Sequence, residues 1–213
     1  MNDMYFAQTP GSASRPERFE TVVEGVSMAF WTDAGVFSKG EIDKGSRTLL
    51  KALPKDLRGR VLDLGCGWGL IGTVIGKTRG DARVVLCDVN ERAVELSRRN
   101  LKENGVDGEV FLSDGFTSLE GTFDTVVTNP PIRAGKSVIY RLFKEAADRL
   151  SPDGRLYLVI RKQQGAESAL KYLNTVFSEA KAVEKSGGFW VIACAGKRGG
   201  DRTKGQVENE RRT

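Results

Sequence analysis

The sequence predicts an α/β protein with a doubly wound, Rossmann-like fold. Short apolar segments alternate with longer amphipathic segments between residues 60 and 177, which indicates parallel strands joined by helices. Near the C-terminus, two apolar segments flank Gly187-Gly188 and predict a hairpin. We therefore expect a seven-stranded, mostly parallel sheet with an antiparallel last strand, helices on both faces and an N-terminal β-hairpin extension.

The N-terminal part of the chain precedes this alternation. Residues 1–18 are rich in proline, glycine and serine, and we expect them to be a flexible segment. Residues 19–23 and 26–31 flank the turn Glu24-Gly25 and predict a β-hairpin, which we extend to about residue 42.

The remaining elements follow in order. Asp43 precedes an apolar periodic stretch that ends at Pro54, which predicts a capped helix. The predicted strands are 60–64, 83–87, 110–112, 125–128, 155–160, 181–185 and 189–195. The predicted helices are 70–78, 91–104, 138–150 (closed by a turn at 151–154) and 167–177. Right-handed crossovers place the carboxyl ends of parallel strands at one edge of the sheet, where ligands bind.

Length and composition fit one domain. The 213 residues are 39% hydrophobic and 29% charged, with a net charge of +5, which is ordinary for a globular protein. We expect the core domain to span residues 19–195, followed by a basic, disordered tail at 196–213. No apolar run is long enough to span a bilayer, so we expect a cytoplasmic location without membrane attachment. Moderate basicity is compatible with an RNA partner.

Several chemistries are excluded by residue content. The chain has no histidine, so Ser-His-Asp and Cys-His catalysis are impossible. Its three cysteines, Cys66, Cys87 and Cys194, lack the paired spacing of a zinc site, and we predict no metal ligands. All three fall in or beside apolar strands, so we expect reduced core residues.

The segment Asp63-Leu64-Gly65-Cys66-Gly67-Trp68-Gly69 is the strongest signal in the chain. It follows a predicted strand and precedes a predicted helix, the context in which glycines let the backbone approach a ligand closely. We interpret it as a loop that contacts the methionine portion and ribose of S-adenosylmethionine. Asp63, at the strand end, would bind the ligand's ammonium group directly or through water. The alternative is a glycine-rich turn without a ligand.

A second acidic position follows the next strand. Asp88 lies nineteen positions after Gly69, where a carboxylate can accept hydrogen bonds from both ribose hydroxyls. An NAD-binding domain places an acid similarly, so Asp88 alone does not discriminate. Its other possible role is to cap the following helix, although Asn90 is better placed for that.

A third acidic position, Asp114, precedes Gly115 just beyond the third strand. Its carboxylate could accept a hydrogen bond from the adenine amino group, and the alternative is a plain Asp-Gly turn. The expected cofactor-binding residues are Asp63, Gly65, Cys66, Gly67, Gly69, Asp88, Val89, Asp114, Gly115 and Asn129.

The fourth strand ends in Asn129-Pro130-Pro131-Ile132. The prolines fix the backbone and remove two amide donors. The Asn129 side chain and the Pro130 carbonyl can then both accept hydrogen bonds from an exocyclic amine and direct its lone pair at a methyl group. We therefore predict Asn129, Pro130 and Pro131 as catalytic residues; the alternative is a proline-terminated strand.

The quartet at 129–132 resembles the Asn-Pro-Pro-aromatic motif of methyltransferases that act on planar amino groups. More closely, residues 19–195 resemble the RsmC-type guanine-N2 methyltransferases of small-subunit ribosomal RNA, particularly their single-domain relatives. The matching stretches are 37–40, 42–46, 63–69, 129–136 and 159–165. The resemblance implies a class I S-adenosylmethionine-dependent enzyme that methylates guanine N2 in 16S-type rRNA, with RNA or the small subunit as partner. We expect a monomer or weak dimer.

Residues for RNA binding are less sharply indicated. Ile132 replaces the aromatic residue that stacks on the target base, so stacking would come from Phe37 or Trp31. Four cations follow strand ends, where RNA phosphates would pass. The predicted substrate-binding residues are Phe37, Ile132, Arg133, Lys136, Arg161 and Lys162, and Gln163 and Gln164 are further candidates for reading base edges.

Two other readings stay open at this point. One is an amino methyltransferase that acts on a protein glutamine amide or on DNA adenine, because Asn-Pro-Pro serves any planar amine. The other is a non-catalytic or NAD-binding Rossmann protein. Trp68 would crowd a pyrophosphate, and Asn129-Pro130-Pro131 would have no role in such a protein.

Overall fold

The computed structural model describes residues 13–36 and 41–198. These ranges leave out residues 1–12 of the predicted flexible segment 1–18 and residues 199–213 of the predicted tail 196–213. Phe37, a predicted substrate-binding residue, also lies outside them. Within them, Ser14 and the Arg15 amide donate hydrogen bonds to the Asp33 carboxylate. Strand β9 continues two residues past the predicted domain end, to Lys197.

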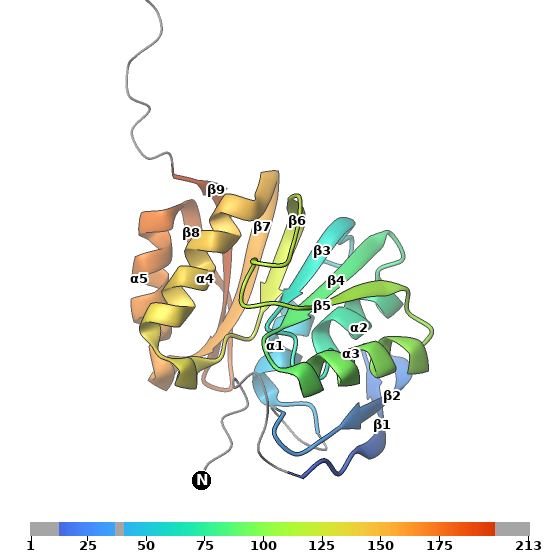
Figure 1. Cartoon of the computed structure of the whole chain (residues 1–213). Coiled ribbons are helices and arrows are strands. Elements are labelled where there is room, and N and C mark those ends of the chain that lie inside the picture. The colour runs from blue at the N-terminus through green and yellow to red at the C-terminus, as the bar shows by residue number, and fades with distance from the viewer. Residues whose placement is uncertain (1–12, 37–40, 199–213) are drawn as a thin grey trace, which may run out of the picture.

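A seven-stranded sheet forms the centre of the described structure (Figure 1), in the order β5-β4-β3-β6-β7-β9-β8. Neighbours from β5 to β7 pair in parallel, whereas β9 is antiparallel to both β7 and β8. The predicted sheet with an antiparallel last strand is therefore confirmed. The strands are β3 (Gly59–Leu64), β4 (Ala82–Asp88), β5 (Gly108–Leu112), β6 (Phe123–Thr128), β7 (Leu150–Arg161), β8 (Phe177–Ser186) and β9 (Phe189–Lys197).

Helices cover both faces of this sheet, as predicted. The α1, α2 and α3 helices pack with one set of inward side chains, and α4 and α5 pack with the other. Strand residues alternate between the two layers because side chains alternate along a strand; Val61 joins the first core and Leu62 the second. The helices are α1 (Lys44–Ala52), α2 (Leu70–Thr78), α3 (Glu91–Glu103), α4 (Lys136–Arg149) and α5 (Ala166–Val176), with 3₁₀ turns η1 (Ile132–Ala134) and η2 (Lys162–Gln164).

Two predicted boundaries differ from the structure. The predicted turn at 151–154 lies inside the irregular start of β7, where the pairing of β6 with β7 shifts register between Phe123 and Thr125. Phe177, predicted to end a helix, instead begins β8, because it pairs with Lys197 while its ring is fully buried.

The N-terminal hairpin of β1 (Glu17–Val23) and β2 (Val26–Thr32) packs against α3. Asn100 and Asn104 lie one helical turn apart and hydrogen-bond the backbone of β2. The Asn104 amide accepts from the Ala29 N–H (3.1 Å) and donates to the Ala29 carbonyl (2.7 Å). The Asn100 amide makes the same two bonds with Trp31, at 2.7 and 2.9 Å. The two side chains therefore serve β2 as a neighbouring strand would.

The hairpin turn is held by a second contact. Glu24 accepts hydrogen bonds from the guanidinium of Arg79, a buried residue at the end of α2, and from Lys55. Burial raises the pKa of Glu24, but the Arg79 and Lys55 hydrogen bonds outweigh it and leave the pKa below its usual value.

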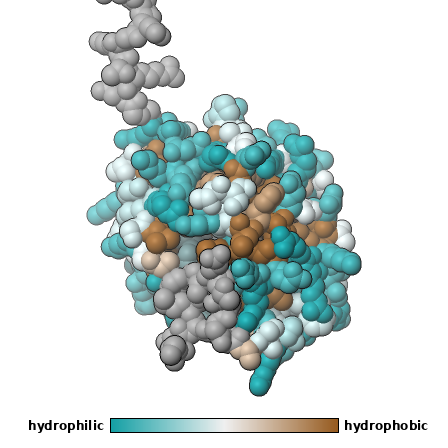
Figure 2. Space-filling view, viewed as in Figure 1, coloured by the Kyte–Doolittle hydropathy of each residue, from teal (hydrophilic) through white to brown (hydrophobic). Residues whose placement is uncertain are grey.

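No helix among the described residues is long and apolar enough to cross a membrane. On the face viewed in Figure 2, apolar side chains gather in the middle of the surface between hydrophilic flanks.

Replacing Asn100 should destabilise the fold through the hairpin. Asn100→Ala leaves the Trp31 N–H and carbonyl, and the Trp68 carbonyl of the loop after β3, without their partner at a site that is 0% exposed, so we expect a loss of about 2 kcal/mol or more in the free energy of unfolding. Urea titration measures this loss. Asn174→Ala, which removes a partly buried amide bonded only to carbonyls, should cost less. Equal stability of Asn100→Ala and the parent chain would contradict the role assigned to Asn100.

Candidate active site

The glycine loop after β3 requires its glycines for two reasons. Gly65, Gly67 and Gly69 have φ values of 69°, 57° and 80°, a region that L-residues rarely adopt. A Cβ on Gly65 or Gly67 would meet no atom within 4 Å, whereas one on Gly69 would lie 2.8 Å from the Ser97 hydroxyl. The first two glycines therefore leave open space beside the loop, and the third lets the loop pack against α3.

Two carboxylates, the buried Asp63 and the partly buried Asp88, hold this loop. One Asp88 oxygen accepts from the Gly67 N–H (2.8 Å) and the other from the Asn90 N–H (2.9 Å). Asp63 accepts from the Gly72 N–H (2.8 Å), and its other oxygen is buried without a hydrogen-bond partner among the described residues. The two acids therefore fix the loop through backbone amides on each side of it.

Burial dominates the electrostatics of both acids. Desolvation raises the pKa of Asp63 to about 7, opposed by the Gly72 hydrogen bond and assisted by the Asp88 charge. Desolvation likewise raises the pKa of Asp88 to about 6, against the hydrogen bonds from Asn90, Gly67 and Val89. A cationic ligand beside the loop would stabilise both ionised forms.

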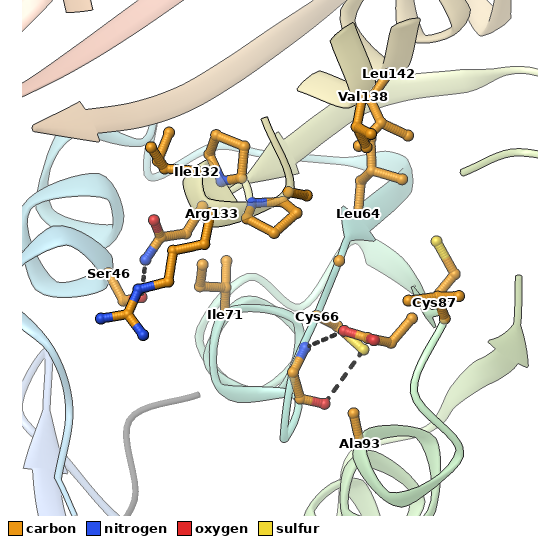
Figure 3. Close-up of a pocket in the computed structure, with 18 of the residues that line it drawn as sticks. Ser46, Leu64, Cys66, Ile71, Cys87, Ala93, Ile132, Arg133, Val138 and Leu142 are labelled. Carbon is orange, nitrogen blue, oxygen red and sulfur yellow. Dashed lines mark hydrogen bonds between the residues drawn. The ribbon is translucent and has the colours of Figure 1, made fainter. Parts of the chain in front are cut away.

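A cavity of about 730 Å³ opens at the carboxyl ends of the parallel strands. Figure 3 shows Ser46, Ile132 and Arg133 on one side of it and Cys66 and Cys87 on the other. Among the predicted site residues, those that line it are Gly65, Cys66, Gly67, Asp88, Val89, Asp114, Gly115, Asn129, Pro130, Pro131, Ile132, Arg133 and Arg161. Of the two further candidates for reading base edges, Gln164 lines the cavity and Gln163 does not. The structure thus brings together residues from the ends of five strands, β3 to β7.

Some predicted residues lie elsewhere. Asp63 and Gly69 support the loop without lining the cavity, and Lys136 and Lys162 begin α4 and η2 outside the cavity lining. Trp31, a candidate for base stacking, is also absent from the lining; its ring lies 3.3 Å from the Arg99 guanidinium on the α3 side.

The two acids after β4 and β5 have different surroundings. Asn90 caps α3 by accepting from the Arg92 and Ala93 amides, so the prediction that Asn90 caps the helix, which leaves Asp88 to face the cavity, is confirmed. Asp114 is 63% exposed and forms an ion pair of 2.6 Å with Arg141, so Arg141 competes with any ligand for this carboxylate.

The Asn129-Pro130-Pro131 turn is tied to the glycine loop. Thr128, the last residue of β6, donates a hydrogen bond of 2.7 Å from its buried hydroxyl to the Leu64 carbonyl at the end of β3. The Asn129 amide nitrogen donates to the Ser46 hydroxyl (3.1 Å) and the Asp43 carboxylate (3.3 Å) of the α1 N-terminus. The turn therefore lies at the cavity wall in a fixed orientation.

Sequence reasoning missed several residues of the cavity wall. Asp43 is predicted to cap the helix, which it does by accepting from the Ser46 N–H. Asp43 and Ser46 also lie in the family-like stretch 42–46, but no site role is predicted for either, and both line the cavity. Phe189 comes from the start of β9, opposite Arg161 on β7. Their proximity to Asn129 depends on how α1 and the C-terminal hairpin pack, which no local motif encodes.

Comparisons with known proteins agree with this geometry. The chain matches the model of the methyltransferase small domain over residues 27–193. It is 38% identical over 196 residues to the uncharacterised protein YbxB of Bacillus subtilis, covering 90% of this chain and 98% of that protein. It is 36% identical to ribosomal RNA small subunit methyltransferase C of Haemophilus influenzae over 78% of this chain and 51% of the relative. This chain thus spans about half the length of that relative.

A solved structure shares the fold closely. The Thermus thermophilus 16S rRNA N2 G1207 methyltransferase (RsmC), in complex with AdoMet and guanosine, superposes with a TM-score of 0.78 at 27% identity, over 85% of this chain and 51% of that one. The fold and site define a class I S-adenosylmethionine-dependent methyltransferase, similar to RsmC over the part that the two chains share. The chain belongs to the methyltransferase small domain family.

The site fits S-adenosylmethionine on its own features. The open space beside Gly65 and Gly67 leaves room for a ligand against the backbone, and the Asp88 carboxylate borders the same cavity. The unpartnered buried oxygen of Asp63 adds negative potential beneath the loop, which suits a cofactor that carries an ammonium and a sulfonium.

A methyl group on the loop should weaken cofactor binding. Gly67→Ala strains a residue at φ 57° and places a Cβ in the open space beside the loop, so we expect at least about tenfold weaker S-adenosylmethionine binding by calorimetry. Gly80→Ala, where a Cβ meets nothing within 4 Å and φ is not positive, is the matched control. Unchanged affinity in Gly67→Ala would mean that the cofactor does not approach this backbone.

Cofactor affinity should depend on pH through Asp88. Because its pKa is raised to about 6, the free protein takes up this proton as the pH falls through 6, and a neutral carboxyl accepts ribose hydroxyls less strongly. We expect affinity to decrease below about pH 6 and calorimetry to detect proton release on binding near that pH. Asp88→Asn should bind weakly and lose the part of the dependence centred near pH 6, while the part from Asp63, whose pKa is raised to about 7, remains; a variant with the parent pH profile would refute the assignment.

Proposed function

We propose that this chain transfers the methyl group of S-adenosylmethionine to N2 of a guanine in small-subunit ribosomal RNA. The observation that carries the proposal is that the glycine loop and the Asn129-Pro130-Pro131 turn line one cavity. A methyl donor bound at the loop would then lie within reach of an amine bound at the turn. The relative from H. influenzae and the T. thermophilus structure, both named for small-subunit rRNA methylation, support guanine N2 as the acceptor.

On the cofactor side, the residues divide by position. Backbone at Gly65, Cys66 and Gly67 would face the methionine portion and ribose, because their open side borders the cavity. Asp88 would accept the ribose hydroxyls, with Val89 beside the adenine. Asp63 and Gly69 would act from beneath by holding the loop, and the charge of the buried Asp63 carboxylate would attract the ammonium group without a direct contact.

The adenine end of the cavity is bordered by Asp114 and Gly115. Asp114 would accept a hydrogen bond from the adenine amino group with its second oxygen, since Arg141 bonds the first. Gly115 has a φ of 59°, and a Cβ there would lie 2.4 Å from a Glu145 oxygen, so this turn admits no larger residue without a shift.

Catalysis would rest on orientation. When bound, the cofactor would supply an electrophilic methyl group on a sulfonium. The leaving group is a neutral thioether, so no acid is needed to protonate it. Asn129 and the Pro130 carbonyl would accept the two N–H bonds of the amine and hold its lone pair toward that carbon. A nitrogen–carbon bond forms as the carbon–sulfur bond breaks, and the amine then releases one proton to water. Pro131 keeps the turn rigid.

RNA would approach over a basic rim. Arg133 and Arg161 line the cavity, and Lys136 and Lys162 follow them on the same two segments. Phosphate contacts by these side chains would position the RNA without reading its sequence. Ile132 would pack on the target base in place of the usual aromatic residue. We place this activity in the cytoplasm and in a chain that acts as a monomer or weak dimer.

One labelling experiment tests the substrate class. The protein and tritiated S-adenosylmethionine are incubated with unmethylated small ribosomal subunits, naked rRNA, DNA, or a ribosome-free protein extract. We expect label in the RNA of the first or second sample. Label confined to protein or DNA would overturn the RNA proposal and favour the glutamine-amide or adenine alternative.

Removing the Asn129 amide should separate chemistry from binding. Asn129→Ala is expected to reduce methyl transfer by about 100-fold or more, because an acceptor for the amine is lost from the transition state. Its affinity for S-adenosylmethionine, measured by calorimetry, should stay within about threefold of the parent value. Loss of both properties would show that Asn129 acts mainly in cofactor binding.

A further inference from the structure

The Asn129 side chain is held by an element that belongs to neither predicted motif. Its amide nitrogen lies 3.3 Å from the Asp43 carboxylate oxygen and 3.1 Å from the Ser46 hydroxyl. Asp43 caps α1, and Ser46 is 4% exposed in the first turn of that helix. All three residues line the cavity, so the contact is made at the cavity wall.

The chemistry of this contact fixes which way the amide points. An ionised carboxylate only accepts hydrogen bonds, so the Asn129 atom beside Asp43 must be the nitrogen. A flipped amide would place its oxygen against the carboxylate and lose the bond to Asp43, which accepts only. With the nitrogen directed at α1, the oxygen is directed away from it, because the two atoms lie on opposite sides of the carboxamide.

The amide oxygen is available to a ligand. Among the described residues, none donates a hydrogen bond to Asn129 Oδ1. Asn129 itself is only partly buried. Since Asn129 lines the cavity, its side chain offers an acceptor there while both of its donor hydrogens serve α1.

We propose that Asp43 and Ser46 are positioning residues that hold the Asn129 amide with its oxygen toward the acceptor amine. The proposal rests on the proposed methyl transfer and deepens it. An amine nucleophile must donate its N–H bonds, so an Asn129 that presented its NH₂ group would repel it. The pair at α1 thereby favours an amino group over a ring nitrogen without a hydrogen as the methyl acceptor.

The variants must separate positioning from helix capping. Asp43→Ser keeps a residue that caps helices well but removes the carboxylate, and Ser46→Ala removes the second acceptor. Thr48→Ala is the matched control, because its hydroxyl on the same helix bonds the Lys44 carbonyl and lies outside the cavity lining.

Single-turnover methyl transfer to unmethylated small subunits gives the first readout. We expect Asp43→Ser to slow transfer by about 10- to 100-fold, Ser46→Ala by less, and Thr48→Ala not at all. Affinity for S-adenosylmethionine should change by less than about twofold in all three. In an Asn129→Ala background, Asp43→Ser should have no further effect, because it acts through Asn129. The proposal would be overturned if Asp43→Ser transferred methyl groups as fast as the parent protein. It would also be overturned if Asp43→Ser slowed transfer equally in the parent protein and in Asn129→Ala.

A readout independent of activity keeps the two proposals distinguishable. The Asn129 side-chain amide signals, assigned in a ¹H–¹⁵N spectrum by their loss in Asn129→Ala, should shift in Asp43→Ser and Ser46→Ala but not in Thr48→Ala. If the parent protein methylates no RNA while these shifts occur, the proposed function fails and the amide contact stands. If Asp43→Ser leaves the signals in place, the positioning role is wrong whatever the activity.

Discussion

The structure of the site depends on the hydrogen bond from the Gly67 amide to the Asp88 carboxylate. It joins the loop after β3 to the end of β4. Asp63, which is buried at the end of β3, accepts a similar hydrogen bond from the Gly72 amide at the start of α2. Both acids are desolvated, with pKa values raised to about 6 and about 7. Burying two neighbouring carboxylates is unfavourable without compensating charge. The positive charges of S-adenosylmethionine offset that cost. The two carboxylates therefore favour binding of this cationic cofactor.

The second half of the site is built onto the first. The Thr128 hydroxyl bonds the Leu64 carbonyl, so the strand that carries Asn129 ends beside the strand that carries the glycine loop. The α1 helix then fixes the Asn129 amide through Asp43 and Ser46. Each contact links elements that are distant in sequence. Together they fix the Asn129 side chain at the cavity wall without a bound substrate. Such preorganisation suits a reaction in which orientation is the main contribution of the protein.

The sequence predicted what local pattern encodes. Alternating strands and helices, the Gly65–Gly69 glycines and the Asn90 cap all appear where periodicity and turn chemistry place them. The parallel topology also predicted that Asp88, Asp114 and Asn129 would meet at one edge of the sheet. The contributions of Asp43, Ser46 and Phe189 were not predictable, because they depend on how α1 and the C-terminal hairpin pack onto that edge. Trp31 has an aromatic ring that could stack on a base, but its strand β2 packs on α3, away from the cavity.

The central claim is that this cavity joins a sulfonium methyl group to an exocyclic amine of guanine. Digestion of the methylated RNA to nucleosides, followed by mass spectrometry against standards, tests it most directly. We expect N2-methylguanosine as the labelled product with the parent protein and its loss with Asn129→Ala. A ring-methylated guanosine, a methylated adenosine or a 2′-O-methyl ribose as the product would contradict it.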